Sequence, residues 1–232
     1  MVNTHIPRPL HGWDLDVPAA QALQLQLAKK VVTDRPLPTP KLIAGVDVSV
    51  REEVSRAAIV VLTYPGLQPI EQATATRPVT FPYIPGLLAF RETPVILEAI
   101  ANLTHDPDVY MVDGQGMAHP RRFGIACHLG LWLNRSTIGC AKSRLTGQYV
   151  EPGPEPGSRS PLLADHQQII GMVLRTKLRS NPLFISVGHL ADLESAVALV
   201  ESCVRGYRLP EPTRWAHNVA GGAVIGGQQS MF

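Results

Sequence analysis

The sequence is poor in cysteine and has no long apolar run. Its three cysteines, Cys127, Cys140 and Cys203, are far apart and odd in number, and none belongs to a Cys-x-x-Cys pair. This pattern argues against a disulfide framework or a zinc knuckle and fits a reducing cytoplasm. No apolar run has the length of a membrane span, and residues 1–13 contain no apolar signal core. We therefore expect a cytoplasmic protein without a membrane partner.

Charged residues are few, and they are unevenly divided. They make up 17% of the chain and leave a net charge of only +2, which excludes a histone-like polycation. Residues 1–115 hold 9 Lys/Arg and 12 Asp/Glu, a net charge of −3, whereas residues 116–232 hold 12 and 7, a net charge of +5. The asymmetry suits a site that holds a metal with carboxylates and a polyanion with Arg and Lys, although many enzymes with neutral ligands share it.

Hydrophobic periodicity predicts strands and helices over most of the chain. Three successive strand patterns with short polar joins indicate an antiparallel meander. The expected strands are 41–50, 57–64, 70–76, 108–113, 136–141, 169–176 and 183–187, and the expected helices are 16–32, 87–102, 124–134 and 192–203. The fold class predicted is α/β, with a mixed sheet in which the meander is joined by parallel strands and flanked by helices, an arrangement that resembles the ribonuclease H-like folds.

We expect residues 1–232 to form a single domain. The Pro/Gly-rich segment 150–161 is too poor in apolar residues to pack and is interpreted as a surface loop. Residues 1–15 and the glycine-rich residues 220–232 are expected to be loose termini, and residues 208–217 to close the ordered part.

The stretch from Met111 to Gly124 has the pattern of a site. A short apolar strand delivers Asp113 to its end, and glycines, His119, Arg121 and Arg122 follow. A carboxylate at a strand end can hold a hard cation, and arginines can bind an anion such as a phosphate. An Asp-Gly turn with solvated arginines is an equally good interpretation of this stretch alone.

Two further acids can join Asp113. Asp47 interrupts an apolar strand, where a charge is costly unless it is paired or bound to metal, and a salt bridge to an arginine is the alternative. Glu92 lies on an expected helix. If the first and fourth strands are adjacent and parallel, Asp47 lies beside Asp113, and a crossing helix can add Glu92. Three converging carboxylates repel unless a cation neutralises them, and oxygen ligands without cysteine indicate Mg²⁺ or Mn²⁺.

A stiff loop, Phe81 to Gly86, presents Tyr83 and Ile84 between two prolines. Such a loop could be a wedge that separates stacked bases, or its Tyr and Ile could pack inward. Its composition alone favours packing.

Taken together, these motifs resemble the endonuclease V family, the deoxyinosine-directed repair nucleases. The resemblance runs from about Leu25 to His217 and rests on seven motifs in order. They are Ile43-Ala44-Gly45-Val46-Asp47, Pro82-Tyr83-Ile84-Pro85-Gly86, Phe90-Arg91-Glu92, Val112-Asp113-Gly114 running to His119-Pro120-Arg121-Arg122, Gly139-Cys140-Ala141-Lys142, Asn181-Pro182-Leu183-Phe184-Ile185 with Gly188-His189, and Tyr207-Arg208-Leu209-Pro210-Glu211-Pro212-Thr213-Arg214.

The resemblance implies roles for individual residues. The metal-binding acids would be Asp47, Glu92 and Asp113, and the other catalytic positions Lys142 and His217, the latter touching the metal site directly or through water. The wedge would be Tyr83, Ile84, Pro85 and Gly86, which reverses the packing interpretation. The base pocket would include Gly114, Gly124, Ile125 and Leu145, and Arg121 and Arg122 would contact phosphates.

The resemblance also implies an activity. The family nicks the second phosphodiester bond 3′ to deoxyinosine, with Mg²⁺ or Mn²⁺ as cofactor, and leaves 3′-hydroxyl and 5′-phosphate ends. The expected partner is deoxyinosine-containing DNA, and no obligate protein partner is evident. Two alternatives stay open: a ribonuclease acting on inosine-containing RNA, and a non-catalytic lesion-binding module that kept the fold.

Overall fold

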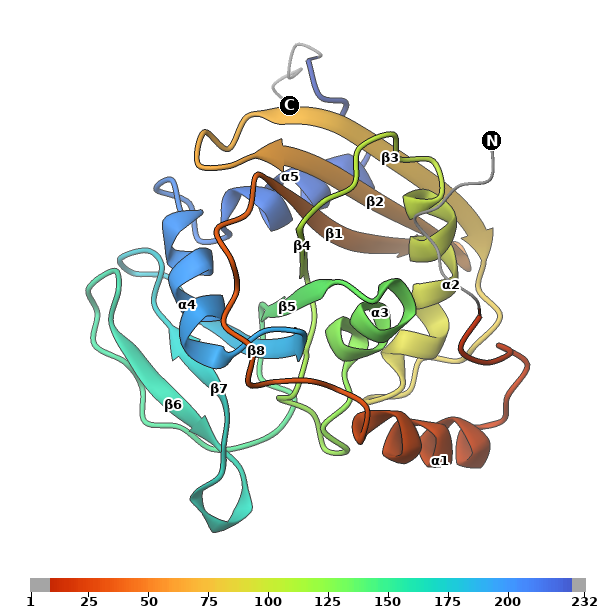
Figure 1. Cartoon of the computed structure of the whole chain (residues 1–232), viewed down its shortest axis with the longest axis horizontal. Helices are drawn as coiled ribbons and strands as arrows, with labels where there is room; N and C mark the ends of the chain where they lie inside the picture. Colours follow the sequence, from red (N-terminus) through yellow and green to blue (C-terminus); the bar gives the residue numbers. More distant parts are fainter. Residues whose placement is uncertain (1–8, 227–232) are drawn as a thin grey trace.

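The computed structural model describes residues 9–226, which build one eight-stranded sheet in the order β3-β2-β1-β4-β5-β8-β7-β6 (Figure 1). The strands are β1 Leu42–Arg51, β2 Val54–Thr63, β3 Pro69–Pro78, β4 Val109–Val112, β5 Ser136–Ala141, β6 Arg159–Leu163, β7 Ile169–Leu174 and β8 Leu183–His189. The helices are α1 Val17–Ala28, α2 Leu88–Ile100, α3 Ile125–Leu133, α4 Leu193–Ser202 and α5 Glu211–Ala220, with a 3₁₀ turn at Asp165–Gln167.

The predicted fold class is confirmed. β1, β2 and β3 form an antiparallel meander, and β1, β4 and β5 run parallel to one another in the centre of the sheet. β8 pairs antiparallel with β5, and β7 and β6 continue to the other edge. The first and fourth strands are therefore adjacent and parallel, which is the arrangement that the position of the acids required.

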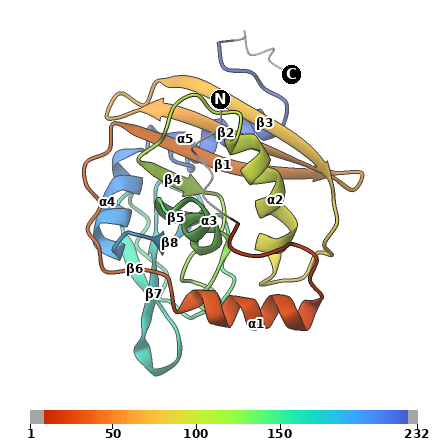
Figure 2. The same cartoon turned by 45° about the vertical axis from the view of Figure 1, so that its right-hand side comes forward.

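Helices cover both faces of the sheet (Figures 1 and 2). Alternate side chains of the central strands point to opposite faces. On one face Ile43 and Met111 pack in a core with α4 and α5, and on the other Ala44 and Tyr110 pack with α2 and α3. α1 lies across the lower rim, where Leu27 packs against residues of the segment leading into α3 and of α3 itself.

Capping residues explain where two helices begin. The Asp16 side chain accepts a hydrogen bond from the Ala19 N–H at 2.8 Å, and Asp192 accepts one from the Ser195 N–H at 2.8 Å. The helix expected over 16–32 ends earlier, at Ala28. α2 continues through Pro94 without ending there.

The segment 150–161 was predicted wrongly in part. Its last residues begin β6, which pairs with β7 from Arg159 opposite Leu174 to Leu163 opposite Ile169. The sequence signal was weak because Ser160 and Pro161 are poor strand formers. An edge strand accepts a proline, since its outward N–H needs no partner in the sheet.

The expectation of loose ends does not hold for several residues that the structure describes. His11 and Trp13 pack on α3, where the rings of Trp13 and Trp132 stack with centroids 5.3 Å apart. At the other end, α5 extends to Ala220, and the Ile225 N–H donates to the Gln72 side chain at 2.7 Å. The parts of these termini at 1–8 and 227–232 lie outside the described residues.

None of the helices within residues 9–226 is both long enough and apolar enough to span a bilayer.

We predict that Gly45→Ala destabilises the protein, because α5 packs directly on β1 at this residue. A Cβ on Gly45 would lie 1.8 Å from the Pro212 carbonyl oxygen, so the start of α5 would have to move. Overpacking of this kind costs about 1–3 kcal/mol. Thermal unfolding followed by circular dichroism should therefore show a lower Tm. Gly12→Ala is the control, since a Cβ there meets nothing within 4 Å, and equal Tm values for the two variants would contradict the prediction.

Candidate active site

The parallel pairing of β1 and β4 brings Asp47 and Asp113 together. Val46 lies opposite Val112, so the residue after each stands at the same level of the sheet. The Asp113 N–H donates to the Val46 carbonyl at 2.9 Å and extends this pairing by one residue. Both side chains are on the face that α5 covers, because strand residues alternate between faces.

His217 on α5 and Lys142 just after β5 complete a polar cluster with the two aspartates. Nδ1 of His217 lies 2.7 Å from Oδ2 of Asp47. Lys142 forms an ion pair with Asp113, and its Nζ lies 4.0 Å from Asp47 and 3.2 Å from Nδ1 of His217. One ring nitrogen cannot donate to Asp47 and accept from Lys142 at once. The shorter contact favours a proton on Nδ1, which leaves Nε2 as a free acceptor.

Three of these residues offer atoms at metal-binding separations. One ligand atom from each of Asp47, Asp113 and His217 lies within 4.8 Å of the other two. Two carboxylate oxygens and one imidazole nitrogen can hold a divalent cation. Glu92 lies outside this group but lines the same cavity of about 430 Å³. The cluster brought closest together thus contains His217 in addition to two of the three predicted acids.

The cavity holds more negative charge than it readily stabilises. Burial, and then the charges of Asp47 and Asp113, raise the pKa of Glu92 to about 8. Burial and the Asp47 charge also raise the pKa of Asp113, while Lys142 opposes that shift. Like-charged carboxylates in one site favour proton uptake, and a bound cation relieves the same repulsion.

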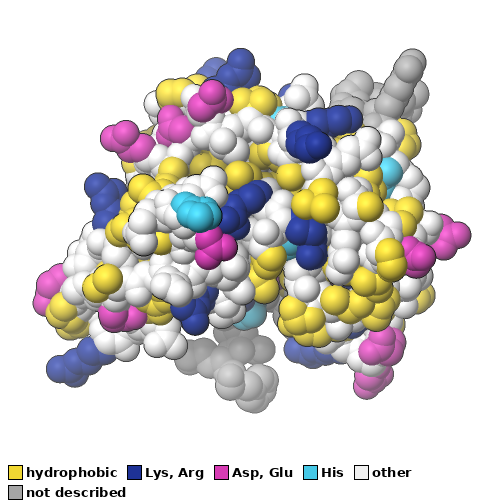
Figure 3. Space-filling model, turned by 90° about the horizontal axis from the view of Figure 1, so that it is seen from below, with side chains coloured by type: hydrophobic (Ala, Val, Ile, Leu, Met, Phe, Trp, Pro, Cys, Tyr) yellow, Lys and Arg dark blue, Asp and Glu magenta, His cyan; other side chains and the backbone are white. Residues whose placement is uncertain are grey.

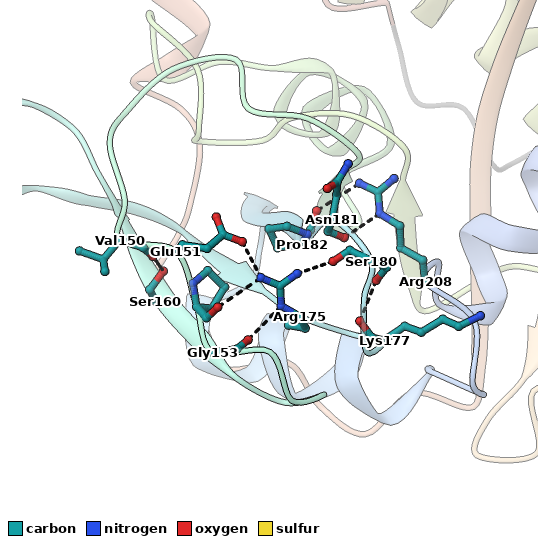
Figure 4. Close-up of polar contacts among 11 residues, drawn as sticks. Val150, Glu151, Gly153, Ser160, Arg175, Lys177, Ser180, Asn181, Pro182 and Arg208 are labelled. Carbon is teal, nitrogen blue, oxygen red and sulfur yellow. Dashed lines mark hydrogen bonds and ion pairs between the residues drawn. The ribbon is translucent and has the colours of Figure 1, made fainter.

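Arg208 fixes the backbone that carries Lys142. Its guanidinium donates to the carbonyls of Lys142 at 2.6 Å, Pro182 at 3.1 Å and Asn181 at 2.9 Å. Figure 4 shows Arg208 on one side of the 177–182 turn and Arg175 on the other. Arg175 in turn donates to the Ser180 and Gly153 carbonyls and pairs with Glu151. The two arginines join the Pro/Gly-rich segment to the end of β5.

A second cavity of about 480 Å³ adjoins the first, and Leu88, Asp113 and Lys142 line both. All residues predicted from the resemblance as wedge and base pocket line this second cavity: Tyr83, Ile84, Pro85, Gly86, Gly114, Gly124, Ile125 and Leu145. Gln24, Ala89, Gln115, His119, Ala141, Ser143 and Arg144 also contribute to it. The structure thus gathers at one cavity residues that are more than 60 positions apart in the sequence.

The loop Phe81–Gly86 has one fixed end and one free tip. The Gly86 carbonyl accepts three hydrogen bonds, from Gln24 at 2.9 Å, His119 at 2.8 Å and Arg121 at 2.8 Å. Gly86 has a φ of +82°, a conformation that glycine adopts without strain. Tyr83 is 70% exposed, whereas Ile84 packs in a small core that includes Phe81. The inward-packing interpretation therefore holds for Ile84. Tyr83 is open to solvent, and its wedge role stays a prediction.

Two glycines of the base-pocket prediction have a packing role in the structure. A Cβ on Gly114 would lie 2.5 Å from Cγ2 of Ile125, and one on Gly124 would lie 2.1 Å from the Gln115 carbonyl oxygen. Their missing side chains let the segment after β4 fold back against the start of α3.

The paired arginines after His119 are bound to protein groups. Arg121 donates to the Gln24 side chain at 2.5 Å as well as to Gly86, and Arg122 donates to the His119 carbonyl at 2.8 Å. Both are half-buried, so they are not simply solvated. Burial lowers the pKa of His119 to about 4, which keeps it neutral beside them.

Several basic side chains lie near the middle of the lower face of the molecule (Figure 3). Seen from below, Lys and Arg side chains gather around the middle of the surface, while most Asp and Glu side chains lie towards its edges (Figure 3). A face with this distribution attracts a polyanion.

Sequence reasoning gave no role to Gln24 or Arg208. Gln24 is only 1% exposed and uses its amide to join α1 to Gly86 and Phe123. The one available signal was a glutamine on the apolar side of a helix, where a buried amide needs partners. For Arg208 no local pattern indicated the three carbonyls that it binds.

Comparison with known proteins identifies the same family as the sequence motifs. A family model described as Endonuclease V matches residues 25–218. An endonuclease V of Dehalococcoides mccartyi is 50% identical over 215 residues, which cover 92% of this chain and 96% of that protein. A crystal structure of endonuclease V from Streptomyces avermitilis has a TM-score of 0.85 and 43% identity, covering 90% of this chain and 93% of that one.

A solved structure with lower sequence identity contains bound DNA. Endonuclease V of Ciona intestinalis, in complex with a 24mer DNA containing an inosine followed by a ribo-adenosine, has a TM-score of 0.75 and 28% identity, covering 86% of this chain and 93% of that one.

We predict that Glu92→Gln stabilises the metal-free protein at alkaline pH. The raised pKa of Glu92 means that the folded state holds its proton more tightly than the unfolded chain. Stability from this group is complete below its ordinary pKa and is lost as pH rises towards about 8. In the presence of chelator, the variant should have a Tm higher by about 2–4 °C or more at pH 9, since ~1 kcal/mol corresponds to that shift, and little advantage at pH 5.

Glu98→Gln is the matched control. Glu98 lies on the same helix as Glu92, α2, but it is exposed and pairs with Arg77 of β3. An increase in Tm for Glu92→Gln that is the same at pH 5 and pH 9 would contradict the raised pKa of Glu92.

Proposed function

Because the chain belongs to the endonuclease V family, we propose that it nicks a DNA strand beside deoxyinosine, the deaminated form of deoxyadenosine. The cut would fall at the second phosphodiester bond 3′ to the lesion and leave 3′-hydroxyl and 5′-phosphate ends. Family membership makes the chain a nuclease of DNA repair. The bond that it cuts and the residues that do so are the proposal.

One observation carries this proposal: a cavity large enough for a base opens directly into the carboxylate cavity. The two share Leu88, Asp113 and Lys142, so a base held in the first would place its own strand across the second. Hypoxanthine pairs poorly, and extruding it costs less than extruding a normal base. Selectivity therefore begins before any contact with the pocket.

The pocket would read the extruded base mainly through backbone groups. The backbones of Gly114 and Gly124 line this cavity, and Ile125 and Leu145 offer apolar surface to the ring faces. Tyr83, largely exposed at the tip of its loop, would fill the gap that the base leaves in the stack, with Ile84, Pro85 and Gly86 supporting it.

The acidic cavity fits a divalent cation. Asp47 and Asp113, with His217 and Glu92 nearby, are the residues that would hold it, and Mg²⁺ with Mn²⁺ as a substitute is the expected ion because carboxylate oxygens dominate the set. When bound, such an ion lowers the pKa of a coordinated water and neutralises charge on the phosphate. The raised pKa of Glu92, caused by burial and by the charges of Asp47 and Asp113, supports this assignment, because a bound cation would relieve that repulsion.

Lys142 and His217 would act on the phosphate directly. The Lys142 ammonium lies beside both aspartates, where it would stabilise charge that develops on the non-bridging oxygens. The free Nε2 of His217 is an acceptor at the exposed side of the cavity and would orient the attacking water. Arg208 would hold Lys142 in place for this role.

Inosine-containing RNA is the second candidate substrate, since the Ciona complexes carry a ribonucleotide next to the inosine. The 2′-hydroxyl distinguishes RNA from DNA at such a site. A non-catalytic lesion-binding module is disfavoured, because the chain has the full set of Asp47, Glu92, Asp113 and Lys142. We place the activity in the cytoplasm, in line with three buried and unpaired cysteines.

We predict that the protein nicks a 5′-labelled DNA strand with one inosine at the second bond 3′ to the lesion, with Mg²⁺ or Mn²⁺ and not with chelator. Asp113→Asn should lower the rate at least 100-fold, because it removes a cation ligand and the partner of Lys142. The matched RNA strand tests the alternative substrate. Preferential cutting of RNA would move the function to transcripts, and binding without cutting by either ion would leave only the lesion-binding module.

We predict that Tyr83→Ala weakens binding of inosine-containing duplex DNA by about 10-fold, since loss of one aromatic stacking partner costs ~1–3 kcal/mol. The single-turnover rate at saturating protein should change much less. Val150→Ala is the control, as it removes another strongly exposed apolar side chain outside both cavities. A dissociation constant that Tyr83→Ala leaves unchanged would remove the wedge role.

A further inference from the structure

Beyond the carboxylate cavity lies a smaller one of about 220 Å³ that contains two arginines, Arg51 and Arg56. It shares Ser49, Arg51, Ala220 and Gly221 with the carboxylate cavity and has no lining residue in common with the base cavity. The three cavities therefore follow one another, with the carboxylates in the middle.

Strand register places the arginines in line with Asp47. Asp47, Ser49 and Arg51 are alternate residues of β1 and so share one face of the sheet. Arg56 of β2 lies directly opposite Ser49, and Thr76 of β3 lies opposite Arg56. At the usual rise of a strand, Arg51 stands about 13 Å along β1 from Asp47. A row of positive charge thus extends from the carboxylates towards the sheet edge.

Neither guanidinium forms a hydrogen bond or an ion pair within the described residues, and the Nε–H of Arg56 is buried without an acceptor there. Several other arginines are paired, as Arg77 is with Glu98 and Arg135 with Asp106. A buried donor needs an acceptor, and a guanidinium fork matches two phosphate oxygens.

The negative groups near this cavity do not neutralise it. Glu52 and Glu53 form the turn between β1 and β2 and are exposed. The carbonyls at the end of α5 are already used: Ala220 accepts from the Ser49 hydroxyl at 2.8 Å, and His217 and Val219 accept from backbone N–H groups after the helix. The cavity therefore remains electropositive.

We propose that Arg51 and Arg56 form a subsite for a backbone phosphate of the nucleic-acid strand on the 3′ side of the bond that is cut. This inference rests on the proposed function, which sets the direction. A strand with its lesion in the base cavity and its cut bond at the carboxylates continues 3′ into the third cavity. The subsite recognises phosphate and carries no base specificity, so it would serve any sequence downstream of the lesion.

The test combines protein variants with neutralised phosphates. Inosine-containing duplexes are prepared with a single methylphosphonate at successive positions 3′ of the expected nick, and kcat/KM is measured for wild type and for the Arg51→Gln/Arg56→Gln double variant. In wild type one position should lower kcat/KM about 10-fold, as expected for loss of a charge-assisted hydrogen bond. The double variant should show that loss with the unmodified duplex and no further loss at that position.

The salt dependence gives an independent measurement. The slope of log kcat/KM against log salt concentration should become shallower in the double variant by about 0.7–0.9, because one phosphate contact is lost. Arg77→Gln is the matched control, an arginine of the adjacent strand that is already paired with Glu98, and it should leave both the slope and the methylphosphonate effect unchanged.

The outcomes separate the two proposals. If wild type nicks the inosine strand but the double variant shows the same slope and the same methylphosphonate losses as wild type, the subsite is wrong and the proposed function stands. If wild type does not nick, the proposed function fails, and the subsite is judged by binding of unmodified single-stranded DNA, where the double variant must again show a shallower salt slope. Arg51→Gln alone, at an exposed residue, carries the test if the double variant does not fold.

Discussion

Repulsion between carboxylates that the fold itself forces together governs this structure. The parallel register of β1 and β4 places Asp47 and Asp113 on the same face of the sheet. Glu92 on α2 lines the same cavity as these two aspartates. The protein supplies only partial compensation, through Lys142 and His217. Burial, and then the charges of Asp47 and Asp113, raise the pKa of Glu92. Apolar side chains would be easier to bury at these positions than carboxylates. The presence of the carboxylates therefore favours a role in binding a cation.

The neighbouring elements keep this cluster in one geometry. α5 approaches β1 closely only because Gly45 has no side chain, and that approach brings His217 to Asp47. Arg208 holds the backbone of Lys142 from the other side and leads directly into α5. A single C-terminal segment, 208–220, therefore places both nitrogen-bearing side chains of the cluster, Lys142 and His217, although their aspartate partners come from the first half of the chain.

The sequence predicted the meander, the parallel fourth strand and the helix bearing Glu92, because alternating apolar residues and acidic caps are local signals. It did not predict α5, whose start is a Pro-Glu-Pro sequence that resembles a loop but suits the first turn of a helix. β6 was also not predicted, because its proline indicates a loop, although a strand at the edge of a sheet can contain one. The residues of the site were assigned through family resemblance, whereas the contacts of Gln24 and Arg208 depend on tertiary structure that no local pattern encodes.

The three hydrogen bonds to the Gly86 carbonyl have a consequence for the binding of nucleic acid. They come from α1 and from the segment after β4, so two separate parts of the chain hold the loop Phe81–Gly86 before any nucleic acid binds. A loop that is ordered in advance loses little conformational entropy on binding. The hydrogen bonds at Gly86 thus lower the entropy cost that this loop would add to binding of nucleic acid.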